Sequence, residues 1–156
     1  MDIPREIVAN LIRATTDVFE TMVLKRIDLI DPAKEIPPRA GSQVAATVGF
    51  TGHRCGAVVF HAGADVAREI AGALLAMPAA EVNGEMADAI GEVTNMIAGT
   101  LRTRMASLEP AWAIAVPTVT IGSDFVTRYA TDAARVLCAF DMEGQGIQVE
   151  LILNRQ

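Results

Sequence analysis

A carboxylate and a carboxamide stand one helical turn apart near the middle of this sequence. They belong to the stretch Asp88-Ala89-Ile90-Gly91-Glu92-Val93-Thr94-Asn95-Met96-Ile97-Ala98-Gly99. On a helix, residues three apart are neighbours, so Glu92 and Asn95 would lie side by side. The amide can donate a hydrogen bond to a water molecule and accept one from it, and the carboxylate can pair with a cation. This combination suits phosphoryl hydrolysis, where catalysis is mainly positioning and electrostatics.

The rest of the sequence adds little chemistry to this pair. It contains no phosphate-binding glycine loop with a lysine, no Cys-x-x-Cys and no Gly-x-Ser-x-Gly. His53 and His61 have no other ligand residues beside them, so structural or exposed roles are favoured over metal binding. A glutamate and an asparagine without a nucleophile or a metal cluster make half of an active site. We therefore expect a partner to supply the other half.

The pair is predicted to lie on an amphipathic helix from about Gly84 to Met105. At 100° per residue, one side of that helix is apolar and the other polar. The apolar side holds Met86, Ile90, Val93, Ile97 and Leu101, and the polar side holds Asp88, Glu92, Asn95, Gly99 and Arg102. A glycine inside a helix costs about 1 kcal/mol relative to alanine, so Gly91 and Gly99 indicate that something approaches this helix closely. The alternative is a solvated outer face whose glycines are tolerated for packing.

Composition limits the class of protein. At 156 residues the chain is long enough for one domain with a sizeable core, and its 51% apolar and 4% aromatic content predicts an aliphatic core. A net charge of −6 argues against nucleic acid or an anionic membrane as the main partner. No apolar run approaches the roughly 20 residues of a membrane span, and the N-terminus lacks the pattern of a secretory signal. Cys55 and Cys138 each fall in an apolar, strand-like run and are expected to be buried thiols, so we expect a cytoplasmic protein.

The flanking segments alternate between helix and strand signals. A first helix is predicted from about Glu6 to Lys25, and a loop rich in proline follows over residues 31–42. Alternating apolar residues predict a hairpin from strands at 43–51 and 57–60. A second helix, with Asp65 as a possible cap, must end near Pro78.

The central helix comes next, with Asn83 as its possible cap. After it the apolar phase changes by one residue at Pro117, which predicts a bulge or a break in a strand. Segment 125–134 is ambiguous between edge strand and loop, and a final hairpin is expected over 136–153. The order of elements predicts an α+β fold with a mainly antiparallel sheet and three main helices packed on one face.

The central stretch resembles the signature of the CheC/CheX/FliY chemotaxis phosphatases, as Asp88-x-x-x-Glu92-x-x-Asn95 continued by Met96 to Gly99. Two further stretches resemble the CheX branch of that family. They are Ala14-Thr15-Thr16-Asp17-Val18-Phe19-Glu20-Thr21-Met22, and Pro117-Thr118-Val119 with Gly122. The resemblance spans most of the chain and implies a single CheX-like domain over residues 1–156.

The resemblance implies dephosphorylation of the aspartyl phosphate on a CheY-like receiver domain, with the central helix inserted across the receiver's active site. By residue match, Asn95 would orient the attacking water and Glu92 would pair with the receiver's lysine. Asp88 would be a supporting polar residue. The Mg²⁺ would come from the receiver, and this chain would hold no metal or cofactor of its own.

Side-chain size suggests that Gly91, Ala98 and Gly99 admit the partner's backbone. A second Glu-x-x-Asn copy, found in CheC-type members, is not reproduced by Glu6 and Asn10, which are four apart. One site per chain is therefore expected. The resemblance also implies a homodimer joined through its sheets. The alternative to an enzyme is a receiver-binding adaptor that keeps the docking face without catalysis, and a scaffold without receiver binding is a further alternative.

Overall fold

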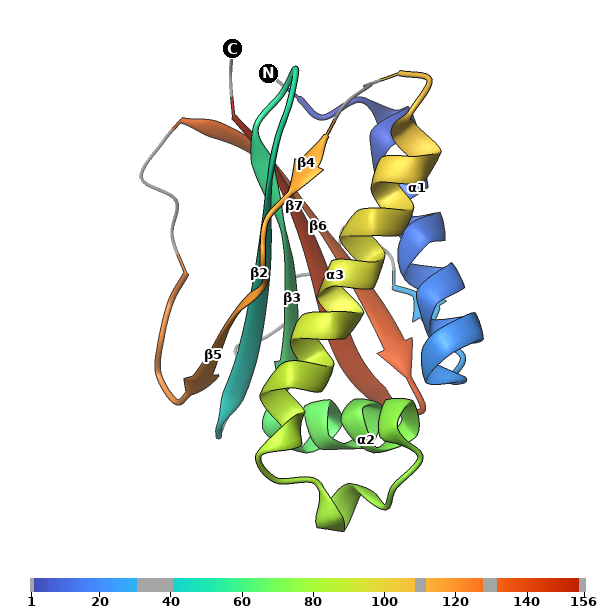
Figure 1. Cartoon of the computed structure of the whole chain (residues 1–156), viewed down its shortest axis with the longest axis vertical. Helices are drawn as coiled ribbons and strands as arrows, with labels where there is room; N and C mark the ends of the chain where they lie inside the picture. The colour runs from blue at the N-terminus through green and yellow to red at the C-terminus, as the bar shows by residue number, and fades with distance from the viewer. Residues whose placement is uncertain (1, 31–40, 109–111, 128–131, 155–156) are drawn as a thin grey trace.

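The sheet is the largest element of the structure, a computed structural model that describes residues 2–30, 41–108, 112–127 and 132–154. Its seven strands run in the order β1-β6-β7-β3-β2-β4, with β5 also paired to β2, and every pairing is antiparallel. The strands are β1 Asp28–Leu29, β2 Gln43–Thr51, β3 Gly56–Gly63, β4 Ala113–Ile114, β5 Thr118–Gly122, β6 Ala133–Met142 and β7 Gln145–Asn154. Three α-helices, α1 Arg5–Val18, α2 Ala64–Leu75 and α3 Glu85–Met105, pack against one face (Figure 1). The predicted α+β fold is confirmed.

Helix α3 crosses the sheet with α1 beside it, and α2 lies across one end of the helical layer (Figure 1). The five apolar positions predicted for the buried side of α3 are all buried, Met86 at 6% exposure and the other four at 0%. These residues belong to the same core cluster as Phe60 of β3 and Leu151 of β7. Burial of this stripe therefore holds α3 against the sheet.

Helix α1 ends in a wider turn than the sequence pattern indicates. After Val18 the chain continues as a π-helical turn over Phe19–Val23, and Leu24 adopts a left-handed conformation with φ of 60°. The wider turn keeps Phe19 and Val23 fully buried, while Met22 between them is 48% exposed. The predicted helix to about Lys25 thus ends close to where expected, with a different last turn.

Both predicted helix caps are wrong. Helix α2 begins with Gly63 as its N-cap, while Asp65 lies in the first turn and accepts a hydrogen bond from Arg68 Nη1 at 2.9 Å. Helix α3 has Gly84 as its N-cap, and the backbone N–H of Asn83 donates to Glu85 Oε2 at 3.1 Å. In both helices a first-turn carboxylate lies at the positive end of the helix dipole, so a side-chain cap is not needed there.

The change of apolar phase at Pro117 is a break between β4 and β5. β4 pairs with the end of β2 through Phe50↔Ile114, and β5 pairs with its start through Thr47↔Thr118, so the register shifts by one residue between them. Ile114 and Val119 both pack against the core. The inserted residue therefore keeps both short strands facing the helices, as the sequence predicts.

Of the other expectations, some are confirmed, some are wrong, and some concern residues outside the described ranges. Cys138 is buried, and burial raises its pKa to about 11, whereas Cys55 is exposed in the turn before β3. The expectation of a buried thiol is thus confirmed for Cys138 and wrong for Cys55. The predicted loop over 31–42 lies outside the described residues except for its last two, as do residues 128–131 of the ambiguous segment. Within the described ranges, no helix is both long and apolar enough to cross a bilayer.

A buried carboxylate lies on the sheet face that the helices leave uncovered. The side chain of Glu150 on β7 is 6% exposed, and it accepts a hydrogen bond from Arg135 Nε at 2.6 Å. His61 Nε2 lies 3.3 Å from its other oxygen. Burial alone would raise the pKa of Glu150, but the hydrogen bonds with His61 and Arg135 and their positive charge hold it below its usual value of 4.5.

Glu150→Gln is expected to lower the free energy of unfolding at neutral pH by about 1–3 kcal/mol, because Arg135 and His61 lose a charged partner. A folded-state pKa below 4.5 means that the carboxylate stabilises the fold above pH 4.5, and that this contribution is lost as the pH falls through the folded pKa. Urea denaturation of both proteins across acidic pH measures the difference. A difference that does not shrink below pH 4.5 would contradict the linkage.

Candidate functional site on helix α3

The solvent-facing side of α3 forms what we call the candidate face, made of Asp88, Glu92, Asn95, Gly99 and Arg102. Asp88, Glu92 and Arg102 are exposed, and Asn95 and Gly99 are half-buried. The polar side expected from the 3.6-residue period is therefore a surface of the folded chain. The side chains of Glu92 and Asn95 do not form a hydrogen bond or ion pair with any described residue. Both groups are available to a partner.

The residues between Glu92 and Asn95 anchor this face. Val93 and Thr94 are fully buried, and the Thr94 hydroxyl donates to the Ile90 carbonyl at 2.8 Å. Because the hydroxyl is satisfied within the helix, it is buried without an unpaired polar atom. Turning the helix to redirect Glu92 or Asn95 would expose these side chains. The two functional groups are therefore held in fixed directions.

Gly91 is small because of a contact within this chain. A Cβ atom added there would lie 3.3 Å from Val119 Cγ2 and 3.4 Å from Pro117 Cβ. Ala98, on the same flank of the helix, is 2% exposed. Gly91 and Ala98 are therefore packed within this chain, and the partner contact expected from their size stays a prediction.

Gly99 differs from Gly91 in its surroundings. Apart from its chain neighbours and the adjacent backbone of α3, nothing among the described residues lies within 4 Å of the position its Cβ would occupy. It follows Asn95 by one turn on the same face. Of the three small residues singled out, Gly99 is the one whose missing side chain leaves room at the surface for another molecule.

The packing of Gly91 against Pro117 and Val119 links two segments whose contact the sequence does not predict. These residues come from two separate stretches that resemble the same family, residues 88–99 and 117–122. In the fold the strand break at Pro117 lies against the helix directly beside the candidate face. An interior glycine in one segment and a proline at a strand break in another were the available signals.

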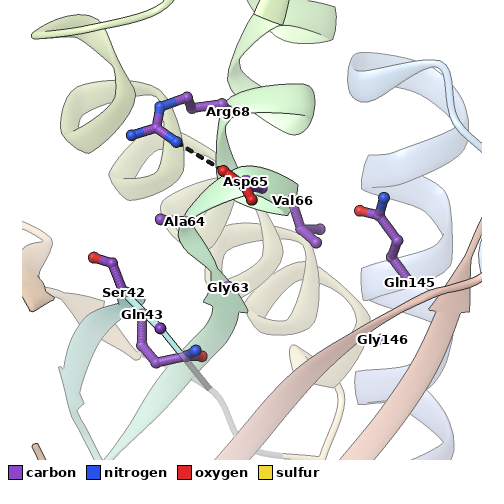
Figure 2. Close-up of a pocket in the computed structure, with 10 residues that line it drawn as sticks. Ser42, Gln43, Gly63, Ala64, Asp65, Val66, Arg68, Gln145 and Gly146 are labelled. Atoms are coloured by element: carbon purple, nitrogen blue, oxygen red, sulfur yellow. Dashed lines mark hydrogen bonds and ion pairs between the residues drawn. The ribbon is translucent and has the colours of Figure 1, made fainter. Parts of the chain in front are cut away.

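The candidate face is not part of a deep pocket. A cavity of about 530 Å³ lies at the start of α2, between Ser42, Gly63 and Gln145, with the Asp65–Arg68 ion pair on its rim (Figure 2). Its lining includes no residue of α3. Within the part of the chain that is described, no three His, Cys, Asp or Glu side chains are grouped to hold a metal ion. An exposed helix face suits a macromolecular partner better than a small substrate.

The fold defines the class of protein. A CheX chemotaxis protein from Vibrio vulnificus has a similar structure, with a TM-score of 0.81, 21% identity and coverage of 96% of this chain and 99% of the other. A CheX protein from Desulfovibrio desulfuricans matches with a TM-score of 0.79, 25% identity and the same two coverages. The CheX–CheY–BeF3–Mg complex from Borrelia burgdorferi contains a chain matched with a TM-score of 0.74, 18% identity, and coverage of 95% of this chain and 97% of that one. This is the CheX-like fold.

The family follows from the sequence. The family model described as chemotaxis phosphatase CheX matches residues 44–141, which include α3 and the break at Pro117. The chain therefore belongs to the CheX family, within the CheC/CheX/FliY superfamily. The first-helix stretch, residues 14–22, lies outside the matched range. No curated protein matches the chain.

Gly99→Ala is expected to raise the free energy of unfolding by about 1 kcal/mol, because alanine is a better helix former and its methyl group meets open space. Gly91→Ala is expected to stabilise less or to destabilise, because its methyl group would press on Val119. Chemical denaturation of the two variants beside the unsubstituted protein measures this. Equal gains at both positions would contradict the packing role of Gly91.

Proposed function

We propose that this protein accelerates hydrolysis of the aspartyl phosphate on a CheY-like receiver domain. The observation that carries the proposal is the Glu92/Asn95 pair on α3 of a CheX family member. The Glu92 side chain is exposed, the Asn95 side chain is half-buried, and neither has a partner among the described residues. The site is half of an active site. The phosphoryl group, its aspartate and the metal ion all belong to the receiver.

In the proposed reaction, Asn95 holds a water molecule in line with the phosphorus–oxygen bond of the acyl phosphate. Water forms the new bond to phosphorus as the aspartyl oxygen leaves with the electron pair of the old one, giving a carboxylate and H2PO4⁻. The amide orients the water and is not a base, since an amide does not take up a proton near neutral pH. Its contribution is positional, and the rigid seating of α3 makes it effective.

Glu92 would pair with the receiver's active-site lysine, which fixes the helix in register with the phosphoryl group. Asp88, one turn before Glu92 and exposed, would make a supporting polar contact at the edge of the interface. Gly99, one turn after Asn95, would let the receiver's backbone come close. The receiver would supply Mg²⁺. The CheX–CheY complex from Borrelia burgdorferi includes BeF3 and Mg, which supports this division.

A homodimer is part of the same proposal. β4 and β5 both pair only with β2 among the described strands, so they form one edge of the sheet. Val116 between them is 86% exposed and Ile121 on β5 is 47% exposed. An edge strand with apolar side chains favours pairing with another strand. A second copy of the chain would cover this edge and leave α3 free for the receiver.

Asn95→Ala is expected to remove most of the acceleration, a loss on the order of 100-fold, because the attacking water loses its positioning group. The measurement is the decay of a phosphorylated receiver with and without the protein. Asn83→Ala is the control, since Asn83 is an exposed asparagine that lies just before α3 and outside the candidate face. If Asn95→Ala retains full activity, the proposed role of the amide is wrong.

Glu92→Ala is expected to raise KM for the phosphorylated receiver, because an ion pair across the interface is lost. Glu81 is an exposed glutamate outside the candidate face, so Glu81→Ala should leave KM unchanged.

Tight binding of a phosphorylated receiver with an unchanged phosphate lifetime would select the adaptor role over the enzyme.

A further inference from the structure

A groove of about 420 Å³ lies between the C-terminal end of α1 and the flank of α3. We call it the α1–α3 groove. Its lining includes Thr21 and Met22 from the α1 end, and Met96, Gly99, Arg102 and Thr103 from α3. Met96 follows Glu92 by four residues, so it is a neighbour of Glu92 on the helix surface. Gly99 and Arg102 belong to both the groove and the candidate face.

Two threonine hydroxyls in the α1–α3 groove are satisfied within the chain. The Thr21 hydroxyl donates to the Asp17 carbonyl at 2.7 Å, and the Thr103 hydroxyl donates to the Gly99 carbonyl at 3.1 Å. Asp17 itself pairs with Arg104 of α3, which ties the two helices together. A partner can therefore cover these groups without having to replace hydrogen bonds to water at Thr21 and Thr103.

Two methionines make the apolar part of the groove. Met22 is 48% exposed at the end of a helix whose neighbouring Phe19 and Val23 are fully buried. Its position is thus set by the core, although its own side chain gains little from burial. Met96 is partly buried and packs against the core. Methionine side chains adapt to irregular surfaces and are common in protein-binding sites.

The area that a stable interface buries indicates that a docked receiver covers more than the candidate face. A specific interface buries about 800 Å² per partner, spread over roughly 20–30 residues. The candidate face offers far fewer side chains along α3, so a receiver that reaches Glu92 and Asn95 must also cover a flank of the helix. Pro117 and Val119 pack directly on α3 along one flank, at Gly91. The flank toward α1 is open and begins at Gly99 and Met96.

We infer that the α1–α3 groove takes an apolar side chain from the receiver surface, beside the receiver's active site, and so contributes to the choice of receiver. This inference rests on the proposed function. It assigns Met22 and Met96 to docking and not to the chemical step. A residue of this kind alters KM and binding while leaving kcat at saturation unchanged.

Met22→Glu tests the inference, because it places a charge in the groove at a position exposed enough to leave the fold intact. We expect KM for the phosphorylated receiver and Kd for the beryllofluoride-loaded receiver to rise by about tenfold, with kcat within about twofold. Met22→Leu, which keeps an apolar side chain, should restore both. The matched control is Leu137→Glu, at a 44% exposed position of β6 on the sheet face away from the helices. It should leave KM and Kd unchanged.

An unchanged Kd for Met22→Glu would overturn the inference, as would an equal weakening by Leu137→Glu. A change in the chain's own sedimentation caused by Met22→Glu would assign the groove to a second copy, and would also overturn it. Asn95→Ala, measured in parallel, separates the two proposals. If Asn95→Ala abolishes acceleration and Met22→Glu binds normally, the groove assignment alone fails. If no receiver is dephosphorylated faster but Met22→Glu still weakens receiver binding, the groove assignment stands and the enzymatic proposal fails.

Discussion

The burial of one side of α3 decides where all its other side chains lie. Ile90, Val93, Ile97 and Leu101 are fully buried against the sheet. Burying a side chain of this size stabilises a fold by about 1.5–3 kcal/mol, so rotation of the helix by one residue would expose several of them at a large cost. Glu92 and Asn95 inherit their directions from this packing. Two groups that make no bond with the described part of their own chain are thus held ready for another molecule.

This rigidity suits a site that is completed by a partner. A flexible pair would lose conformational freedom when it docks, and that cost would weaken binding. A helix already seated on a sheet loses little. Its neighbours serve the same end, since Gly91 lets Pro117 and Val119 support one flank and the Asp17–Arg104 pair ties α1 to the other. The chain supplies position and direction, and in the proposed function the receiver supplies the metal ion and the phosphoryl group.

Periodicity and composition predict much of this architecture. The apolar stripe of α3, its bounds, the strand hairpins and the break at Pro117 all follow from patterns of two or 3.6 residues. Local chemistry is less informative, because several side chains can satisfy a helix N-terminus. The sequence indicates Asp65 and Asn83 as possible caps, whereas Gly63 and Gly84 are the N-cap residues.

The role of Gly91 could not be predicted, because it depends on Val119, which is distant in sequence and meets the helix only in the fold. The α1–α3 groove was not predictable for the same reason. It requires the relative placement of two helices and the π-helical turn that leaves Met22 exposed. The Glu92/Asn95 pair itself could be found, since its spacing is local and asparagine is a poor helix former.

The central claim is that α3 completes a catalytic site and does not merely bind a receiver. The most direct measurement is the decay of a fully phosphorylated receiver pool after a substoichiometric amount of this protein is added. Catalysis predicts that the whole pool loses its phosphoryl groups faster, because each molecule acts on many receivers in turn. Decay that is unchanged, or altered only in a fraction of the pool equal to the amount of protein added, would contradict the account.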